Sequence, residues 1–180
     1  MRLLTSQVLK VPVGRWLLAG MLGFSSLVQA DPAAEALWAA CPAGLPKSDV
    51  QGRPLDWAAW RHTPVLAVLW SPDCAFCQRH NAKLEALLRE VPDAAVIGIA
   101  VDSPPDAVTR AVQRRGYSFP VIADGSGPCA VRPQLTPRRV IPMTCWLGEA
   151  PAQPRCIPGE MSNDDLRDLL KLQARSRRHS

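Results

Sequence analysis

The chain has 180 residues, 47% of them hydrophobic, and a formal net charge of +5 at pH 7. Three of the positive charges lie within the first 15 residues, so the rest of the chain carries only +2. This small excess argues against binding to nucleic acid, which needs a strongly basic face to neutralise phosphates. The length suits one domain with a single core.

Residues 1–30 are typical of a signal peptide. A basic start without acidic residues is followed by an apolar run over 16–28 and by the small residue Ala30. The run is shorter than the roughly 20 residues that a membrane-spanning helix needs. We therefore predict export to the periplasm with cleavage after Ala30, and an uncleaved membrane anchor is the alternative.

The next segments alternate between predicted helices and strands. Residues 31–60 are broken by Pro42, Pro46 and Pro54 and predict a short helix followed by an irregular or strand-like segment. The apolar run 64–70 predicts a strand buried on both faces, and the leucine spacing in 75–90 predicts a helix. A second buried strand is predicted over 94–102.

The second half continues this alternation. A helix over 103–115 begins with tolerated prolines and ends at Gly116, and a short strand is predicted over 119–123. A loop that contains Cys129 follows, and then residues 140–147 predict a strand with a proline near its start.

The chain ends with a predicted hairpin and helix. Residues 155–157 are expected to return antiparallel to 140–147, and Ser162 is expected to cap a final helix that contains four leucines. Residues 173–180 are interpreted as a basic, flexible tail. Together the elements predict an α/β fold whose central mixed sheet is flanked by helices.

All the cysteines follow the predicted cleavage site, and their number is even in a chain sent to a compartment where disulfides persist. They lie at positions 41, 74, 77, 129, 145 and 156.

Cys74 and Cys77 lie between a predicted buried strand and the first turn of a helix. Free N–H groups and the helix dipole favour a thiolate at the first cysteine, so Cys74 is the expected nucleophile. Cys77, one turn later, is expected to resolve the mixed disulfide. Ala75 and Phe76, which separate the two cysteines, are expected to influence the redox potential.

Other uses of this spacing are less favoured. Zinc needs two further ligands, and only His62 and His80 lie nearby. Covalent haem needs histidine at position 78, where the chain has glutamine. A structural disulfide remains an alternative, and no metal or cofactor is expected. His80 is interpreted as a surface histidine.

The run VLAVLWSPDCAFCQRHNAKLEALL, residues 65–88, resembles the strand, C-x-x-C motif and helix of thioredoxins. The wider span 50–172 resembles the TlpA-like periplasmic branch of the thioredoxin-like superfamily, and 31–49 form an N-terminal extension. That branch carries an additional helix and strand, which residues 102–125 match. The resemblance implies a thioredoxin-like fold with this added helix-strand insertion.

The same resemblance assigns Pro142 as the family's cis-proline, which faces the dithiol and helps to hold an extended substrate segment. It implies that Ile141, Met143 and Trp70 line the substrate approach, with Trp70 beside the dithiol. By itself, the sequence shows only a proline at the start of a strand.

Two positions depart from the family pattern. Asp73 stands where a tryptophan commonly precedes the nucleophile, and its carboxylate would oppose a thiolate at Cys74 or else cap the helix. Val68 stands where thioredoxins carry a buried acid. Proton transfer at Cys77 would then need another group or water.

The remaining cysteines are expected to form structural disulfides. Cys145 and Cys156 flank the predicted hairpin, where a cross-strand disulfide is feasible, and a second redox relay is the less favoured interpretation. Cys41 and Cys129 would then pair by elimination, although the sequence does not fix the connectivity.

The leading hypothesis is a periplasmic thiol-disulfide oxidoreductase that acts on exported, cysteine-containing proteins in the reducing direction. The resemblance implies a membrane electron donor of the DsbD type. A weaker similarity of CAFC to Dsb and conjugative-transfer proteins favours oxidation or isomerisation during assembly of an envelope or conjugative machine. A non-catalytic binding module with a structural disulfide is the alternative of another class, and a peroxidase is disfavoured because T-x-x-C is absent.

Overall fold

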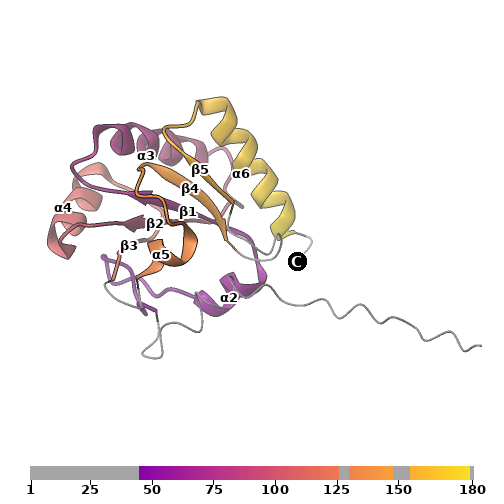
Figure 1. Ribbon diagram of the computed structural model, residues 1–180. Helices are drawn as coiled ribbons and strands as arrows, with labels where there is room; N and C mark the ends of the chain where they lie inside the picture. Colours follow the sequence, from indigo (N-terminus) through magenta and orange to yellow (C-terminus); the bar gives the residue numbers. More distant parts are fainter. Residues whose placement is uncertain (1–44, 126–129, 148–154, 179–180) are drawn as a thin grey trace, which may run out of the picture.

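The computed structural model of the protein describes residues 45–125, 130–147 and 155–178 (Figure 1). The predicted signal peptide and the predicted pairing of Cys41 with Cys129 lie outside the described residues.

A five-stranded mixed sheet forms the centre of the fold, in the order β3-β2-β1-β4-β5. β1 pairs parallel with β2, and β2 pairs parallel with β3. β4 runs antiparallel to β1, and β5 forms the outer strand of a hairpin with β4. The strands are β1 (Val65–Trp70), β2 (Val96–Ala100), β3 (Val121–Ala123), β4 (Met143–Leu147) and β5 (Arg155–Pro158).

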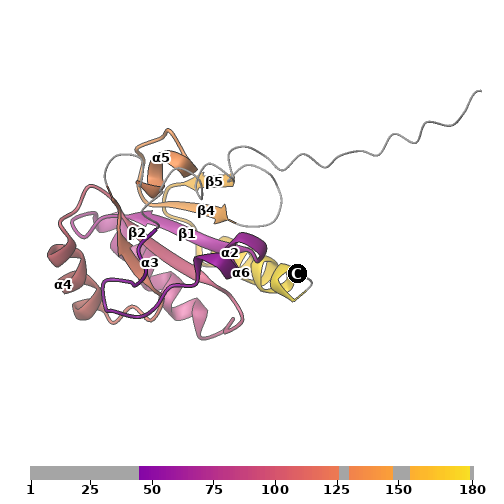
Figure 2. The ribbon, with the colours of Figure 1, turned by 90° about the horizontal axis from the view of Figure 1, so that it is seen from below.

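Helices cover both faces of this sheet, which gives three layers (Figures 1 and 2). One face packs against residues of α3, α4 and α6, and the other packs against α2 and α5. The helices are α2 (Trp57–His62), α3 (Ala75–Leu88), α4 (Pro105–Arg115), α5 (Val131–Leu135) and α6 (Asn163–Arg177). The predicted α/β fold with a mixed sheet and flanking helices is therefore confirmed.

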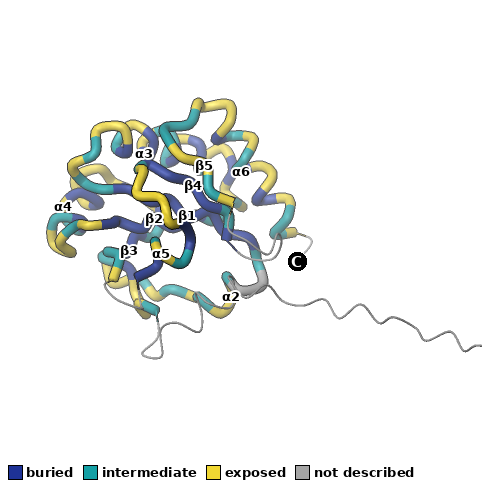
Figure 3. The backbone as a smooth tube through the Cα atoms, in the orientation of Figure 1, coloured by how far each residue is buried: buried dark blue, intermediate teal, exposed yellow. Residues whose placement is uncertain are grey.

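β1 divides the core into two parts because its side chains alternate between the faces of the sheet. Leu66, Val68 and Trp70 pack on the α3 side, whereas Val65 and Leu69 pack on the α5 side. All six residues of the strand are buried, and the middle of the sheet is the most buried part of the molecule (Figure 3). Because both faces of β1 are buried, its sequence is a continuous apolar run rather than an alternation of apolar and polar residues.

The segment 102–125, expected to add a helix and a strand, forms α4 and β3. Gly116 ends α4 with φ +65°, a left-handed conformation that glycine adopts without a steric penalty. β3 then pairs at the edge of the sheet beside β2.

Two short helices differ from the sequence prediction. The short helix expected near the start of 31–60 lies outside the described residues. α2 lies where an irregular segment was predicted, and the Asp56 side chain caps it by accepting from Ala59 N–H at 2.9 Å. α5 lies where a loop was predicted. Its first two amides, those of Val131 and Arg132, donate to the carboxylate of Asp124, which lies outside the helix, at 2.6 and 3.2 Å.

The predicted tail boundary at residue 173 is wrong. α6 continues to Arg177, and Gln173 is fully buried. The Gln173 amide donates to Pro64 O at 2.6 Å and accepts from Ala95 N–H at 3.0 Å, so it joins α6 to the segments that lead into β1 and β2. The basic side chains that suggested disorder lie in the last turn, where positive charge is favourable to a helix.

Cys145 and Cys156 form a disulfide across the β4–β5 hairpin, where they are direct partners in the strand register. Cys145 belongs to the core on the α5 side, whereas Cys77 belongs to the core on the α3 side. The sheet therefore separates this disulfide from the C-x-x-C pair, which favours a structural role over a redox relay.

Replacing Cys145 and Cys156 together by alanine is expected to lower the free energy of unfolding by about 2–3 kcal/mol, because the unfolded chain loses a cross-link that closes a short loop. Urea unfolding of the wild type and the double variant measures the difference. Exchange of the Cys74–Cys77 disulfide at low denaturant is expected to be unchanged, and loss of that exchange in a folded variant would instead indicate a relay.

Candidate active site

The turn between β1 and α3 places the two cysteines at the start of the helix. Cys74 is the N-cap residue, and its amide donates to Ser71 O at 3.2 Å. The Gln78 side chain reaches back and donates to Pro72 O at 2.6 Å, while the Ser103 hydroxyl donates to the Ser71 hydroxyl at 3.3 Å. These bonds fix the turn, and the sequence prediction did not include Gln78 or Ser103.

Cys74 and Cys77 form a disulfide in the structure. Cys74 is half-buried, whereas Cys77 has no exposed surface. The Cys77 amide donates to Cys74 Sγ at 3.1 Å, and a donor in this position favours the thiolate when the disulfide is reduced. The unequal exposure suits Cys74 as the nucleophile and Cys77 as the resolving thiol.

Asp73 is exposed beside Cys74, but it does not cap α3, because the cap position belongs to Cys74 itself. The Asp73 carboxylate therefore does not act as a helix cap, and the role that remains for it is electrostatic repulsion of the Cys74 thiolate. Ala75 and Phe76 are both exposed between the cysteines. The Phe76 ring is 60% exposed, and the Arg79 guanidinium lies 4.6 Å from its centroid.

The Ile141–Pro142 peptide bond is cis, and it lies directly before β4. Pro142 is buried, and its carbonyl accepts from Gly159 N–H at 2.8 Å. Ile141 is half-buried and packs against both parts of the core. The preceding Val140 is 52% exposed, so it offers an apolar surface that the sequence prediction omitted.

Two residues assigned to the substrate approach cannot line it. Met143 has no exposed surface, because alternation along β4 turns its side chain into the core on the α5 side. Trp70 is only 1% exposed, and its ring packs edge-on against Tyr117 at 5.7 Å. Both residues support the site from within the core rather than contact a substrate.

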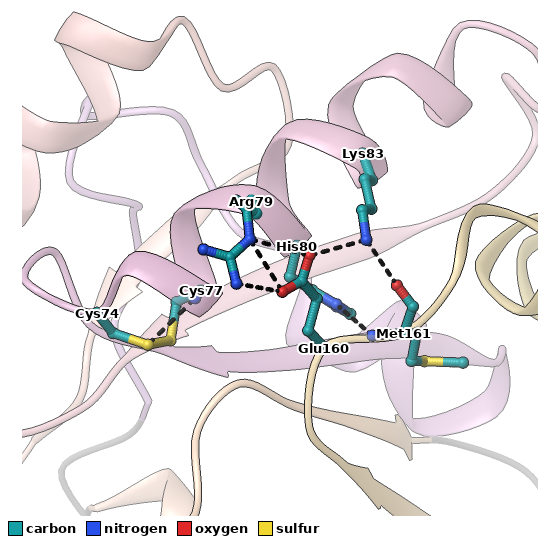
Figure 4. A network of polar contacts seen from close by, with 7 residues as sticks. All are labelled: Cys74, Cys77, Arg79, His80, Lys83, Glu160 and Met161. Carbon is teal, nitrogen blue, oxygen red and sulfur yellow. Dashed lines mark hydrogen bonds and ion pairs between the residues drawn. A yellow bond between two sulfur atoms is a disulfide. The ribbon is translucent and has the colours of Figure 1, made fainter.

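His80 is fully buried, so its interpretation as a surface histidine is wrong. Its Nδ1 accepts from Met161 N–H at 3.3 Å, and its Nε2 lies 3.1 Å from the Thr144 hydroxyl (Figure 4 shows the contact with Met161). Burial, followed by the positive charge of Lys83, lowers the pKa of His80 to about 4, although Glu160 opposes this change. The imidazole is therefore neutral at pH 7.

Glu160 lies between two cations of α3 (Figure 4). Its carboxylate is 2.8 Å from Lys83 Nζ and 2.8 Å from Arg79 Nη2. Hydrogen bonds from Lys83 and Arg79 lower the pKa of Glu160, which keeps it ionised. The spacing in the sequence gave no sign of this cluster, because about 80 residues separate its two sides.

In the part of the chain that the structure describes, no group of three or more His, Cys, Asp or Glu side chains could hold a metal ion. No helix among those residues is long and apolar enough to cross a membrane.

A family model, described as the AhpC/TSA family, matches residues 39–133, which is more than half of the chain. The chain belongs to the AhpC/TSA family. The match includes the turn, the C-x-x-C pair and all of α3 and α4. No curated protein matches the sequence.

Solved structures show that this AhpC/TSA family member has a thioredoxin-like fold. A secreted disulfide oxidoreductase of Mycobacterium tuberculosis, described as homologous to E. coli DsbE, is 20% identical with a TM-score of 0.61, covering 77% of this chain and 98% of that one. A thioredoxin-family thiol:disulfide interchange protein from Chlorobium tepidum TLS is 16% identical with a TM-score of 0.59, covering 71% and 90%. A secreted thiol-disulfide isomerase from Corynebacterium glutamicum is 20% identical with a TM-score of 0.55, covering 73% and 85%.

In this AhpC/TSA family protein, replacing Asp73 by asparagine is expected to raise the alkylation rate of reduced Cys74 at pH 7 by about threefold. This estimate treats the carboxylate and the thiolate as charges about 6 Å apart in water. Iodoacetamide labelling followed by mass spectrometry measures the rate. Asp168→Asn on the exposed side of α6 is the matched control, and an equal effect there would contradict the local explanation.

His80 is expected to make stability depend on pH. Its pKa is about 4 in the folded protein and 6.5 when unperturbed, so between these values the unfolded chain binds more protons. The stabilisation is complete above pH 6.5 and is lost as the pH falls toward 4, by about 3 kcal/mol in total. Urea unfolding at pH 7.5 and 4.5 measures it, and His80→Gln is expected to flatten the dependence.

Proposed function

We propose that this protein is an exported thiol-disulfide oxidoreductase that reduces disulfides of other exported proteins through Cys74 and Cys77. The observation that carries the proposal is the disulfide between a half-buried cysteine at a helix N-terminus and a buried cysteine one turn later. The apolar Val140 and Ile141 lie before Pro142, at the start of the strand next to β1.

The reaction consists of two exchanges of sulfur partners. The Cys74 thiolate attacks one sulfur of the substrate disulfide, forming a mixed disulfide and releasing the other substrate sulfur as a thiolate. The Cys77 thiol then loses its proton and attacks Cys74 Sγ, which releases the second substrate thiolate. The substrate gains two electrons and two protons, and the protein is left with the Cys74–Cys77 disulfide.

Electrostatics around Cys74 support the reducing direction. A disulfide is strongly oxidising when the thiolate of its reduced form is especially stable. Here the donor to Cys74 Sγ is a neutral amide, Asp73 opposes the thiolate, and the cations Arg79 and Lys83 are paired with Glu160. This balance favours a reductant over a strong oxidant.

The proposed location is the periplasm. The signal-peptide pattern over residues 1–30 supports export, and the Cys145–Cys156 disulfide suits an oxidising compartment. A reductant in such a compartment must be reduced again after each turnover. We propose a membrane electron donor of the DsbD type for that step.

The redox equilibrium of the purified protein with glutathione tests the proposal. We expect a potential at or below about −230 mV, in the range of reducing thioredoxins and glutaredoxins. A value near about −120 mV, as for a strong oxidant, would instead support disulfide oxidation during assembly of an envelope machine.

Trapping of substrates is the second measurement. Cys77→Ser is expected to accumulate mixed disulfides with exported proteins, whereas Cys74→Ser, the matched control, is expected to trap none. If Cys77→Ser also traps none and the wild-type pair does not exchange with glutathione, the pair is a structural disulfide and the domain is a binding module.

A further inference from the structure

Residues 159–161, which connect β5 to α6, contact both the Pro142 segment and the helix that carries Cys77. Gly159 N–H donates to Pro142 O at 2.8 Å, and Met161 N–H donates to His80 Nδ1 at 3.3 Å. Gly159 has φ +96°, a conformation that other residues adopt only with strain. The short loop therefore joins Pro142 to the helix that carries Cys77.

Charged side chains reinforce the same connection. Glu160 is paired with Arg79 and Lys83, and Lys83 also donates to Met161 O at 3.1 Å (Figure 4). Arg79 in turn lies over the exposed ring of Phe76. Contacts from this loop thus reach the surface between the two cysteines.

His80 makes a second, buried connection to the Pro142 strand. The Met161 amide is always a donor, so Nδ1 is an acceptor and the proton of the neutral imidazole is on Nε2. Nε2–H then donates to the hydroxyl of Thr144, which is 1% exposed and lies two residues after Pro142. His80 binds the loop with one nitrogen and β4 with the other.

These bonds make His80 unsuitable as a proton acceptor for Cys77. Both ring nitrogens are occupied, and a further proton on Nδ1 would break the bond from Met161. The charged groups that face the ring are Lys83 and Glu160, and the net effect of burial and charge favours the neutral form. The remaining role is positional.

We propose that His80, Thr144 and the 159–161 loop form a clamp that fixes Pro142 relative to the dithiol, and that this clamp is needed for polypeptide disulfides but not for small ones. This inference rests on the proposed oxidoreductase function. The family resemblance implies that an extended polypeptide lies along the Pro142 segment while Cys74 attacks, whereas a small aromatic disulfide needs only access to Cys74. The clamp residues are positioning residues, because they act through Pro142 and the helix.

Thr144→Val tests the buried part of the clamp. It keeps the shape of the side chain but removes the acceptor of His80 Nε2–H, and Thr144→Ser restores that acceptor. Full-length variants are assayed on insulin with dithiothreitol as the reductant, and the reduced protein, freed of dithiothreitol, is assayed in a single turnover on 5,5′-dithiobis(2-nitrobenzoic acid). We expect Thr144→Val to raise KM for insulin about fivefold, which corresponds to one hydrogen bond, with a near-wild-type rate on the small disulfide. Thr144→Ser is expected to retain the wild-type KM.

Glu160→Gln tests the ion pairs of the clamp and leaves the core intact. It therefore still tests the clamp proposal if Thr144→Val fails to fold. It is expected to raise KM for insulin in the same way. Glu90→Gln is the matched control, because Glu90 forms an ion pair with Arg167 at the far end of α3.

The outcomes separate the two proposals. If the wild type reduces neither substrate, the oxidoreductase proposal fails. Suppose instead that the wild type reduces both substrates. If the folded Thr144→Val and Glu160→Gln variants then keep full activity on both substrates, or lose the same fraction of activity on each, only the clamp proposal is overturned.

Discussion

The junction between β1 and α3 is the constraint on which the rest of the site depends. β1 is buried on both faces and cannot shift without exposing apolar side chains, so the point where α3 begins is fixed. Cys74 is at that point, and its sulfur accepts a hydrogen bond from the Cys77 amide in the first turn of the helix. Because Cys77 follows one turn later on the inner face, one thiol is accessible and the other is protected.

The second strand of the site is held to this junction by polar contacts within and beside an apolar core. Pro142 lies at the start of β4, which pairs antiparallel with β1. Its position relative to α3 depends on Gly159, on the Glu160 ion pairs and on the neutral imidazole of His80. A charged imidazole would lose the hydrogen bond from the Met161 amide to Nδ1, and burial keeps the imidazole neutral by lowering its pKa. The Cys145–Cys156 disulfide fastens the same hairpin from the opposite face.

Much of the fold and the centre of the site were predictable because their signals are local. Apolar runs predicted β1 and β2, and Gly116 and Ser162 marked helix ends where the structure has them. The errors share one cause, which is that the deciding contact lies outside the local segment. α5 is capped by Asp124 from outside the helix, and Gln173 is buried because it reaches the segments before β1 and β2. Met143 was assigned to the substrate approach, but the alternation of a paired strand turns it inward.

The sequence by itself determined that the chain has a C-x-x-C pair at a strand-to-helix junction, with a cysteine pair at the ends of a hairpin. These features depend on spacing and periodicity, which are properties of short segments. Only the tertiary structure decided that His80 is a core residue and that residues 159–161 join the dithiol helix to Pro142. These facts depend on pairing between segments as much as 80 residues apart, and local spacing carries no record of which distant backbone amide or carboxylate will face a given side chain.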